Sequence, residues 1–197
     1  MFKTWYKDIM SIQGVKYELG MHDTDSYLFK VSNREKFFHH FDRLMDYSNY
    51  EETHPKYSTA KKAQLGYFKD ELCGKFVCTE FVGLRSKCYA MNLEDEKTPK
   101  SSEKRVCKGL GRSAITSRLK FDQYKDCLFK NQTVRHDFHA IRSVNHSIKT
   151  VLIRKKALNF FETKRWLFNC GIHSCPYGSY LIKKHGGDCP KCNRLFE

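Results

Sequence analysis

Residues 17–31 read YELGMHDTDSYLFKV, in which two short, largely apolar runs flank a polar turn at Asp23 and Thr24. This pattern predicts a β-hairpin. Asp23 and Asp25 are separated by one residue, so on a strand their side chains face the same way within about 7 Å of each other. Two such carboxylates can approach one divalent ion, but Asp-Thr-Asp-Ser is also ordinary turn chemistry. The hairpin tip is therefore either an acidic turn or part of a metal site.

The segments around this hairpin predict an α+β chain. Residues 33–45 carry apolar side chains at helical spacing after Ser32 or Asn33 as the cap, which predicts a helix. Pro99 and the serines that follow it lie in a charged run, so residues 93–104 are the expected linker between two units. Further expected elements are a second hairpin within residues 66–91 around Cys73 and Gly74, helices over residues 113–118 and 121–129, and extended segments over residues 140–161.

The composition describes a folded and strongly basic chain. Its 197 residues include 36 Lys and Arg against 22 Asp and Glu, which gives a net charge of +14, and 14% of them are aromatic. That much aromatic surface can form a core, which excludes a disordered polycation such as a histone-like tail. The positive charge favours a polyanionic partner, nucleic acid before a membrane surface.

Two segments of the second half carry much of the positive charge. Residues 100–120 hold seven basic side chains against one acid, and residues 130–156 hold seven against one again. Apolar residues are interleaved throughout both segments, so both are expected on folded surfaces. A single basic run is usually a solvated face, whereas two in one chain favour a surface that binds nucleic acid.

Neither a membrane span nor an export signal is expected. The longest run without Asp, Glu, Lys or Arg, residues 166–182, is interrupted by Asn169 and Pro176 and cannot be one spanning helix. Lys3 and Lys7 lie where a signal peptide needs an unbroken apolar stretch. We therefore expect an intracellular protein, in the nucleus or the cytoplasm, without a membrane partner.

Beyond the hairpin tip, the chain resembles the C-terminal part of a family B DNA polymerase, in which Asp-Thr-Asp-Ser on a hairpin is the third polymerase motif of the palm. Residues 69–75 (KDELCGK), 80–89 (EFVGLRSKCY) and 124–129 (YKDCLF) are similar to the protein-primed branch carried by Polinton-type transposons and related viruses. The resemblance covers most of the chain. It implies a partial palm of antiparallel hairpins with a packed helix, a small mixed thumb-like basic subdomain and a Cys/His-rich tail, over residues 1–92, 105–165 and 166–197.

The resemblance also implies roles for particular residues. Asp23 and Asp25 would be catalytic carboxylates that hold Mg2+ for two-metal nucleotidyl transfer. The tripeptide KCY, 62 positions beyond Asp25, matches the Lys-x-Tyr motif that contacts the primer terminus. Lys87 and Arg85 would contact primer phosphates, while Tyr89 would pack on the sugar or base. The residues that we expect in the thumb, gripping the backbone of a primer–template duplex, are Arg112, Arg118 and Lys120.

Two parts of such a polymerase are not recognised in this sequence. Family B enzymes need an earlier Asp-x-x-Ser-Leu-Tyr motif with another metal-binding aspartate, and a fingers helix with a Lys and a Tyr-Gly that bind the incoming dNTP. Asp8 mimics the first motif only superficially. We therefore expect a DNA-directed DNA polymerase fragment that binds DNA but is inactive without a separate N-terminal segment. The alternative is a non-catalytic basic nucleic-acid-binding module with a zinc-binding tail.

The last part of the chain concentrates cysteines. Cys170 and Cys175 form Cys-x4-Cys, thirteen residues follow, and Cys189 and Cys192 form Cys-Pro-Lys-Cys, close to the spacing of a zinc ribbon or knuckle; His173 lies in the same group. Against zinc, the surrounding residues resemble an ordinary polymerase C-terminus that needs none, so both interpretations stay open. Without an export signal no disulfide framework is expected. The remaining cysteines are expected as small core residues, at positions 73, 78, 88, 107 and 127.

Overall fold

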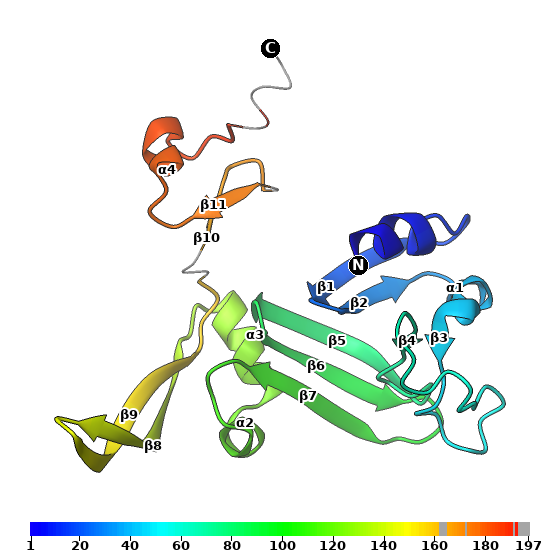
Figure 1. Cartoon of the computed structure of the whole chain (residues 1–197), viewed down its shortest axis with the longest axis horizontal. Coiled ribbons are helices and arrows are strands. Elements are labelled where there is room, and N and C mark those ends of the chain that lie inside the picture. Colours follow the sequence, from blue (N-terminus) through cyan, green and yellow to red (C-terminus); the bar gives the residue numbers. More distant parts are fainter. Residues whose placement is uncertain (162–164, 172, 191, 193–197) are drawn as a thin grey trace.

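The computed structural model describes residues 1–161, 165–171, 173–190 and 192, and it shows an α+β chain (Figure 1). An N-terminal part holds a hairpin and a helix. A central part holds a three-stranded sheet, two helices and a long two-stranded ribbon, and a small tail follows. Each part has a hydrophobic cluster of its own.

The N-terminal part contains the predicted hairpin and helix. A π-helical segment (Thr4–Ile9) precedes strands β1 (Tyr17–Asp23) and β2 (Ser26–Val31), which pair antiparallel. Helix α1 (Arg34–Phe41) starts after Asn33, whose side chain accepts a hydrogen bond from the Lys36 main-chain N–H at 2.9 Å. A 3-10 turn (Asp42–Leu44) then replaces the last predicted turn of the helix. The cluster under these elements is Trp5, Ile9, Ile12, Phe37, Phe41, Met45, Tyr47 and Tyr50.

A short parallel pair of strands completes this part, and strand β1 then lies close to the central sheet. Strand β3 (Met45–Asp46) pairs with β4 (Phe68–Lys69). On β1, the register with β2 shifts around Gly20, and a Cβ atom at that position would lie 3.6 Å from the ring of Phe81 and 3.3 Å from the Leu28 carbonyl oxygen. The ring contact would be an ordinary one, whereas the contact with the Leu28 carbonyl would be tight, so glycine relieves crowding against β2 where β1 lies against β5 (Phe76–Arg85).

The central sheet has the order β5–β6–β7 and is antiparallel throughout, with β6 at Cys88–Asp95 and β7 at Ser101–Cys107. A hairpin is present in this region, but its strands are β5 and β6 and it turns at Ser86 and Lys87, not at Cys73 and Gly74 as expected. The structure differs from the sequence analysis at residues 93–104, which are not a linker but the end of β6, a turn and the start of β7. Pro99 lies in this turn, because a residue that favours linkers also favours hairpin connections, whereas Ser101 and Ser102 begin β7.

One hydrophobic core spans the expected division between the palm and the thumb-like part. Helices α2 (Arg112–Arg118) and α3 (Phe121–Phe129) form as predicted, and α3 packs on β5 and β6. The core combines side chains from before and after residues 93–104: Val82, Leu84, Cys88, Ala90, Cys107, Leu119, Phe121, Tyr124, Cys127, Ala157 and Leu158.

A long ribbon projects from this core (Figure 1). Strands β8 (Val134–Val144) and β9 (Ser147–Leu158) pair antiparallel, so the expected extended segments are confirmed and begin earlier than predicted. Asn145 and His146 form the two-residue tip with φ of 49° and 60°. Positive φ at both positions suits the right-handed twist of a two-stranded ribbon, and asparagine adopts it readily.

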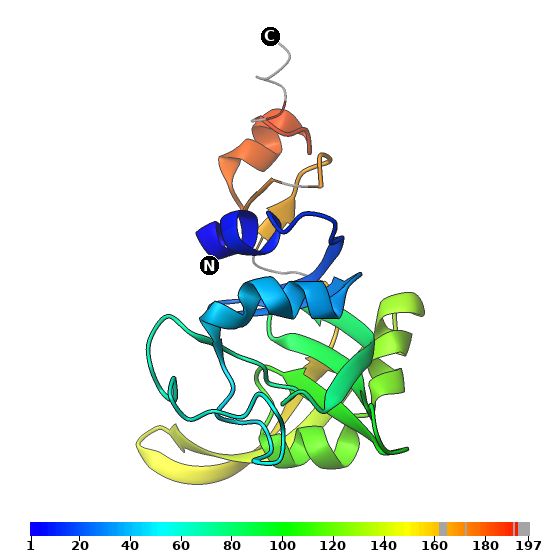
Figure 2. The same ribbon diagram turned by 90° about the vertical axis from the view of Figure 1, so that its right-hand side faces the viewer.

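The C-terminal tail is a compact unit at one end of the molecule (Figure 2). Strands β10 (Arg165–Leu167) and β11 (Ser174–Pro176) pair antiparallel, and helix α4 (Tyr180–His185) starts at the Ser179 cap. Of the predicted tail, residues 172, 191 and 193–197 lie outside the described residues. Among the helices of the described residues, none has the length and apolar character that crossing a bilayer requires.

Candidate functional site

Two hairpin tips that are distant in sequence meet in the structure. Asp23 ends β1, and Lys87 lies in the two-residue turn between β5 and β6. The Lys87 Nζ atom lies 2.8 and 2.7 Å from the two carboxylate oxygens of Asp23, across a separation of 64 positions in the chain. The fold therefore joins a residue that the resemblance assigns to metal binding with one that it assigns to primer contact.

The backbone at both tips adopts an unusual conformation. Thr24 and Lys87 each have a φ of 56°. This left-handed region is uncommon for residues other than glycine and is costly for a β-branched residue such as threonine. The Thr24 hydroxyl donates a hydrogen bond to Asp23 Oδ1 at 3.1 Å, and the Ser26 hydroxyl donates to the Asp23 carbonyl at 3.0 Å. The polar side chains of Asp-Thr-Asp-Ser thus hold the strained tip that presents Asp23.

The charges at this tip are partly compensated. The hydrogen bond from Lys87 holds the pKa of Asp23 below its usual value, so its carboxylate is ionised at neutral pH. Asp25 is exposed in the turn. In the part of the chain that the structure describes, no third Asp, Glu, His or Cys joins these two carboxylates at metal-ligand spacing. No metal-binding group is therefore formed at the hairpin tip among the residues that the structure describes.

Tyr89 and Arg85 point to different surroundings. Tyr89 lies on β6 opposite Gly83, and its ring centroid is 6.1 Å from that of Phe81. Burial raises the pKa of Tyr89, and the charges of Lys104 and Glu71 act on it more strongly than those of Asp23 and Lys87. The positive charge of Arg85 instead acts on Cys88, and its Nε is buried. The structure thus brings Lys87 and Tyr89 together but directs Arg85 partly inward.

The predicted thumb residues are exposed at a different edge of the sheet. Arg112 and Arg118 lie at the two ends of α2, and Lys120 precedes α3. Helix α2 contacts β7, at one edge of β5–β6–β7, whereas the hairpin that carries Asp23 contacts β5, at the other edge. No ion pair is found for these three cations within the described ranges, although the Arg118 guanidinium lies 3.3 Å from His136 Nδ1. Their charge is available to a polyanion.

A second constellation lies in the tail, where one histidine and three cysteines converge. The ligand atoms of Cys170, His173, Cys189 and Cys192 all lie within 4.8 Å of one another, and this cluster could bind a metal such as zinc. The His173 Nδ1 atom is 3.6, 3.3 and 3.4 Å from the sulfurs of Cys170, Cys189 and Cys192. A tetrahedral Zn2+ ion with ordinary bond lengths places nitrogen and sulfur ligands about 3.5 Å apart. The donor set therefore fits zinc in both type and spacing.

The structure corrects the predicted ligand set. Cys175 is not part of the cluster: it lies on β11 opposite Trp166 and is buried in the tail core with Phe168. His173 takes its place as the second ligand. The sequence contained a pattern that points to His173, since Cys170-x-x-His173 has the same spacing as Cys189-x-x-Cys192. Choosing four cysteines as the ligand set left this pattern unused.

Two short backbone turns present the sulfurs. The main-chain N–H of His173 donates to Cys170 Sγ at 3.3 Å, and that of Cys192 donates to Cys189 Sγ at 3.4 Å. Such donors stabilise negative charge on sulfur, which a thiolate ligand requires. Hydrogen bonding with Cys189, together with burial, raises the pKa of the Cys192 thiol to about 11, so in the ion-free cluster this thiol keeps its proton at neutral pH.

Comparisons with known proteins leave these two constellations to be interpreted by their own chemistry, since the chain matched no protein-family model, no curated protein and no solved structure.

Proposed function

We propose that the chain is the palm-and-thumb part of a protein-primed family B DNA polymerase, which holds primer–template DNA while Asp23 and Asp25 offer carboxylates to divalent ions. The observation that supports this most strongly is the ion pair between Lys87 and Asp23, at 2.7 Å. The resemblance assigns these residues to metal binding and to primer contact. In a polymerase these two tasks must meet at the primer terminus, so their residues have to be neighbours in space.

The pair suggests how the tip would work. In the absence of DNA, Lys87 neutralises Asp23. When a divalent ion occupies the two carboxylates, Lys87 would release Asp23 and donate a charge-assisted hydrogen bond to a primer phosphate, beside Tyr89. A bound ion would supply activation of the primer 3′-hydroxyl and stabilisation of the leaving pyrophosphate. Because the two carboxylates are an incomplete set, the proposal requires further acidic ligands and the dNTP-binding residues from another polypeptide segment.

Replacing Lys87 with methionine should strengthen the binding of Mn2+ at this tip, because the competing ammonium is removed while the length of the side chain is kept. We expect the Kd of Mn2+ to fall roughly fivefold, the scale of an exposed ion pair. Calorimetric titration measures this change. The matched control is Lys30→Met on the same hairpin, where Lys30 lies 4.0 Å from Glu18. Identical titrations of the wild type and an Asp23→Asn, Asp25→Asn double variant would contradict a metal site here.

The proposal itself is tested with DNA ends. The wild type should bind a recessed primer–template end more tightly than a blunt duplex of equal length, and Lys87→Ala and Tyr89→Ala should each reduce this preference roughly fivefold while leaving blunt-end affinity nearly unchanged. Fluorescence anisotropy with both substrates measures the ratio, with Lys30→Ala as the control. Equal affinity of the wild type for both ends would refute the primer-contact role.

A second candidate function, a non-catalytic nucleic-acid-binding module whose tail holds Zn2+, is favoured by the cluster of His173 with three cysteines. Three thiolates and one imidazole are the donors that Zn2+ prefers, and four protein ligands close the coordination sphere, which is typical of structural rather than catalytic sites. Zn2+ would then stabilise the tail, and the exposed cations near α2 would bind DNA without regard to its ends. The two functions differ in the preference for recessed DNA ends, which the anisotropy experiment measures.

A further inference from the structure

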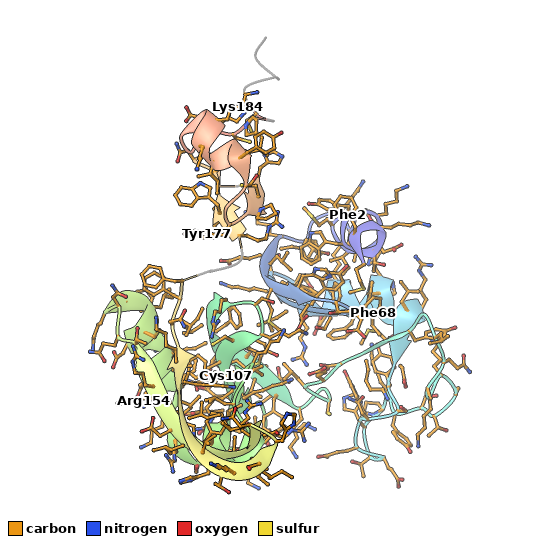
Figure 3. All side chains as sticks on the ribbon, turned by 60° about the vertical axis from the view of Figure 1, so that its left-hand side comes forward. Phe2, Phe68, Cys107, Arg154, Tyr177 and Lys184 are labelled. Carbon is orange, nitrogen blue, oxygen red and sulfur yellow. The ribbon has the colours of Figure 1, made fainter. Side chains whose placement is uncertain are left out.

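Two buried thiols face each other in the middle of the central core. Cys88 begins β6 and Cys107 ends β7, and the strand register places them directly opposite each other. Their exposed fractions are 1% and 2%, and both belong to the core between the sheet, α3 and β9. Figure 3 shows Cys107 among the densely packed side chains of this region.

The position of this pair in the ladder brings the sulfurs close together. The neighbouring residues form the hydrogen-bonded pair, since the Lys108 N–H donates to the Lys87 carbonyl at 2.8 Å. Hydrogen-bonded and non-hydrogen-bonded pairs alternate in an antiparallel ladder, so Cys88 and Cys107 are a non-hydrogen-bonded pair, with Cα atoms about 4.5 Å apart. Disulfides are found at Cα separations from about 4.4 to 6.8 Å. The backbone can therefore accept a bond between the two sulfurs without moving far.

The surroundings distinguish one thiol as the nucleophile. The Cys107 thiol and the positive charge of the Arg85 guanidinium both act on Cys88 and favour negative charge on its sulfur. These contacts lower the pKa of Cys88 to about 7. The Arg85 Nε atom is buried and has no hydrogen-bond partner within the described residues. Cys107 Sγ lies 3.1 Å from the Ala157 carbonyl oxygen, which accepts its proton in a hydrogen bond.

We propose that Cys88 and Cys107 form an intramolecular disulfide when the protein meets hydrogen peroxide. The Cys88 thiolate attacks one peroxide oxygen, the O–O bond breaks, and the hydroxide that leaves takes up a proton as water. The resulting Cys88 sulfenic acid is then attacked by the Cys107 sulfur, which loses its proton as a second water leaves. Two thiols are oxidised by two electrons and one peroxide is reduced to two water molecules.

This modification would act on the predicted primer-contact strand without being part of it. Cys88 lies between Lys87 and Tyr89, so the bond would fix this end of β6 to β7 and remove the thiolate that Arg85 contacts. The proposal rests on the register and the contacts of the two thiols, and it stands whether or not the chain binds primer ends.

The test uses the full chain loaded with Zn2+. Protein treated with hydrogen peroxide is quenched, alkylated, digested without reduction and examined by mass spectrometry. We expect a cross-linked peptide pair containing Cys88 and Cys107, lighter by two hydrogen atoms than the sum of the reduced peptides, which disappears after dithiothreitol. Cys127 is the internal control, since it is equally buried in the same core on α3. It should stay a free thiol, which reacts with the alkylating reagent once the protein is unfolded. Full alkylation of Cys88 and Cys107 in a sample whose exposed Met10 is oxidised would overturn the proposal.

A second measurement separates this chemistry from mere proximity. Arg85→Gln keeps both thiols but removes the cation beside Cys88, and it should slow cross-linking by roughly tenfold at pH 7, because less of the thiolate is present. The difference should shrink as the pH is raised toward 9, where both proteins hold thiolate. A rate that is unchanged by Arg85→Gln at every pH would contradict the role of Cys88 as the attacking sulfur. Cys107→Ala should abolish the cross-linked peptide, and the wild-type result decides the proposal even where this variant fails to fold.

Discussion

One Zn2+ ion per chain should copurify with the protein or bind stoichiometrically on reconstitution, and His173→Ala or Cys189→Ser should abolish this binding. Loss of an outer-shell partner already weakens zinc sites by about 10- to 100-fold, so loss of a direct ligand should exceed that range. The matched control is Cys175→Ala, which removes a buried tail cysteine that is not in the cluster. It should keep the ion. Metal analysis and competition with a chromophoric chelator measure content and affinity.

Removal of the ion should also unfold the tail. The hydrophobic core of the tail contains few buried side chains, Phe168, Cys175 and Cys189, so much of the stability of the tail would come from the metal. Trp166 packs against Tyr177 with ring centroids 5.7 Å apart and reports on this region. In a Trp5→Phe background, chelation should shift the emission of Trp166 toward longer wavelengths, and Zn2+ should restore it. Metal binding that survives His173→Ala but is lost in Cys175→Ala would favour the four-cysteine set and contradict the structure.

Reversing the charge of Arg112, Arg118 and Lys120 to glutamate should weaken binding to any duplex DNA by roughly 100-fold at low salt. All three side chains are exposed, and their cations can reach phosphates without breaking an ion pair in the described part of the chain. The logarithm of affinity should fall with the logarithm of salt by about 0.9 for each phosphate contact, so losing three contacts should make that slope shallower by about 2.7. Anisotropy titrations over a range of salt concentrations measure both quantities.

The control must change net charge equally at another place. Lys7, Lys16 and Lys62 are exposed lysines of the N-terminal part, and their reversal to glutamate matches the change in net charge. If binding depends on the α2 region, this control should retain most of its affinity and the full salt slope. Equal losses in both triple variants would mean that net charge alone attracts DNA. The position of the three cations near α2 would then have no part in DNA binding.

Local features of the sequence were sufficient for most of the secondary structure. The features that predicted the first hairpin and the helices depend on neighbours within a few positions. They are the pattern of residues 17–31, the cap at Asn33 and the spacing before Arg118, and the hairpin and helices form there. The residues of the tail cluster were also gathered by spacing alone. The local prediction failed at the turn around Pro99, because proline favours a hairpin connection as much as a linker, and Ser101 and Ser102 pair in β7.

The contacts that define the candidate sites depended on tertiary structure. Lys87 reaches Asp23 because the first hairpin lies against β5, a packing contact that no periodicity encodes. The sequence predicted Asp23 at a hairpin tip, whereas the fold decided that Lys87 lies at a second tip and that the two tips meet. In the same way, spacing in the sequence placed Cys175 and His173 in one candidate group. In the structure, strand pairing directs the Cys175 side chain into the tail core, whereas His173 lies beside the three other cysteines of the group. Side-chain direction on a strand alternates with each residue, so register, a long-range property, decides which neighbour faces the site.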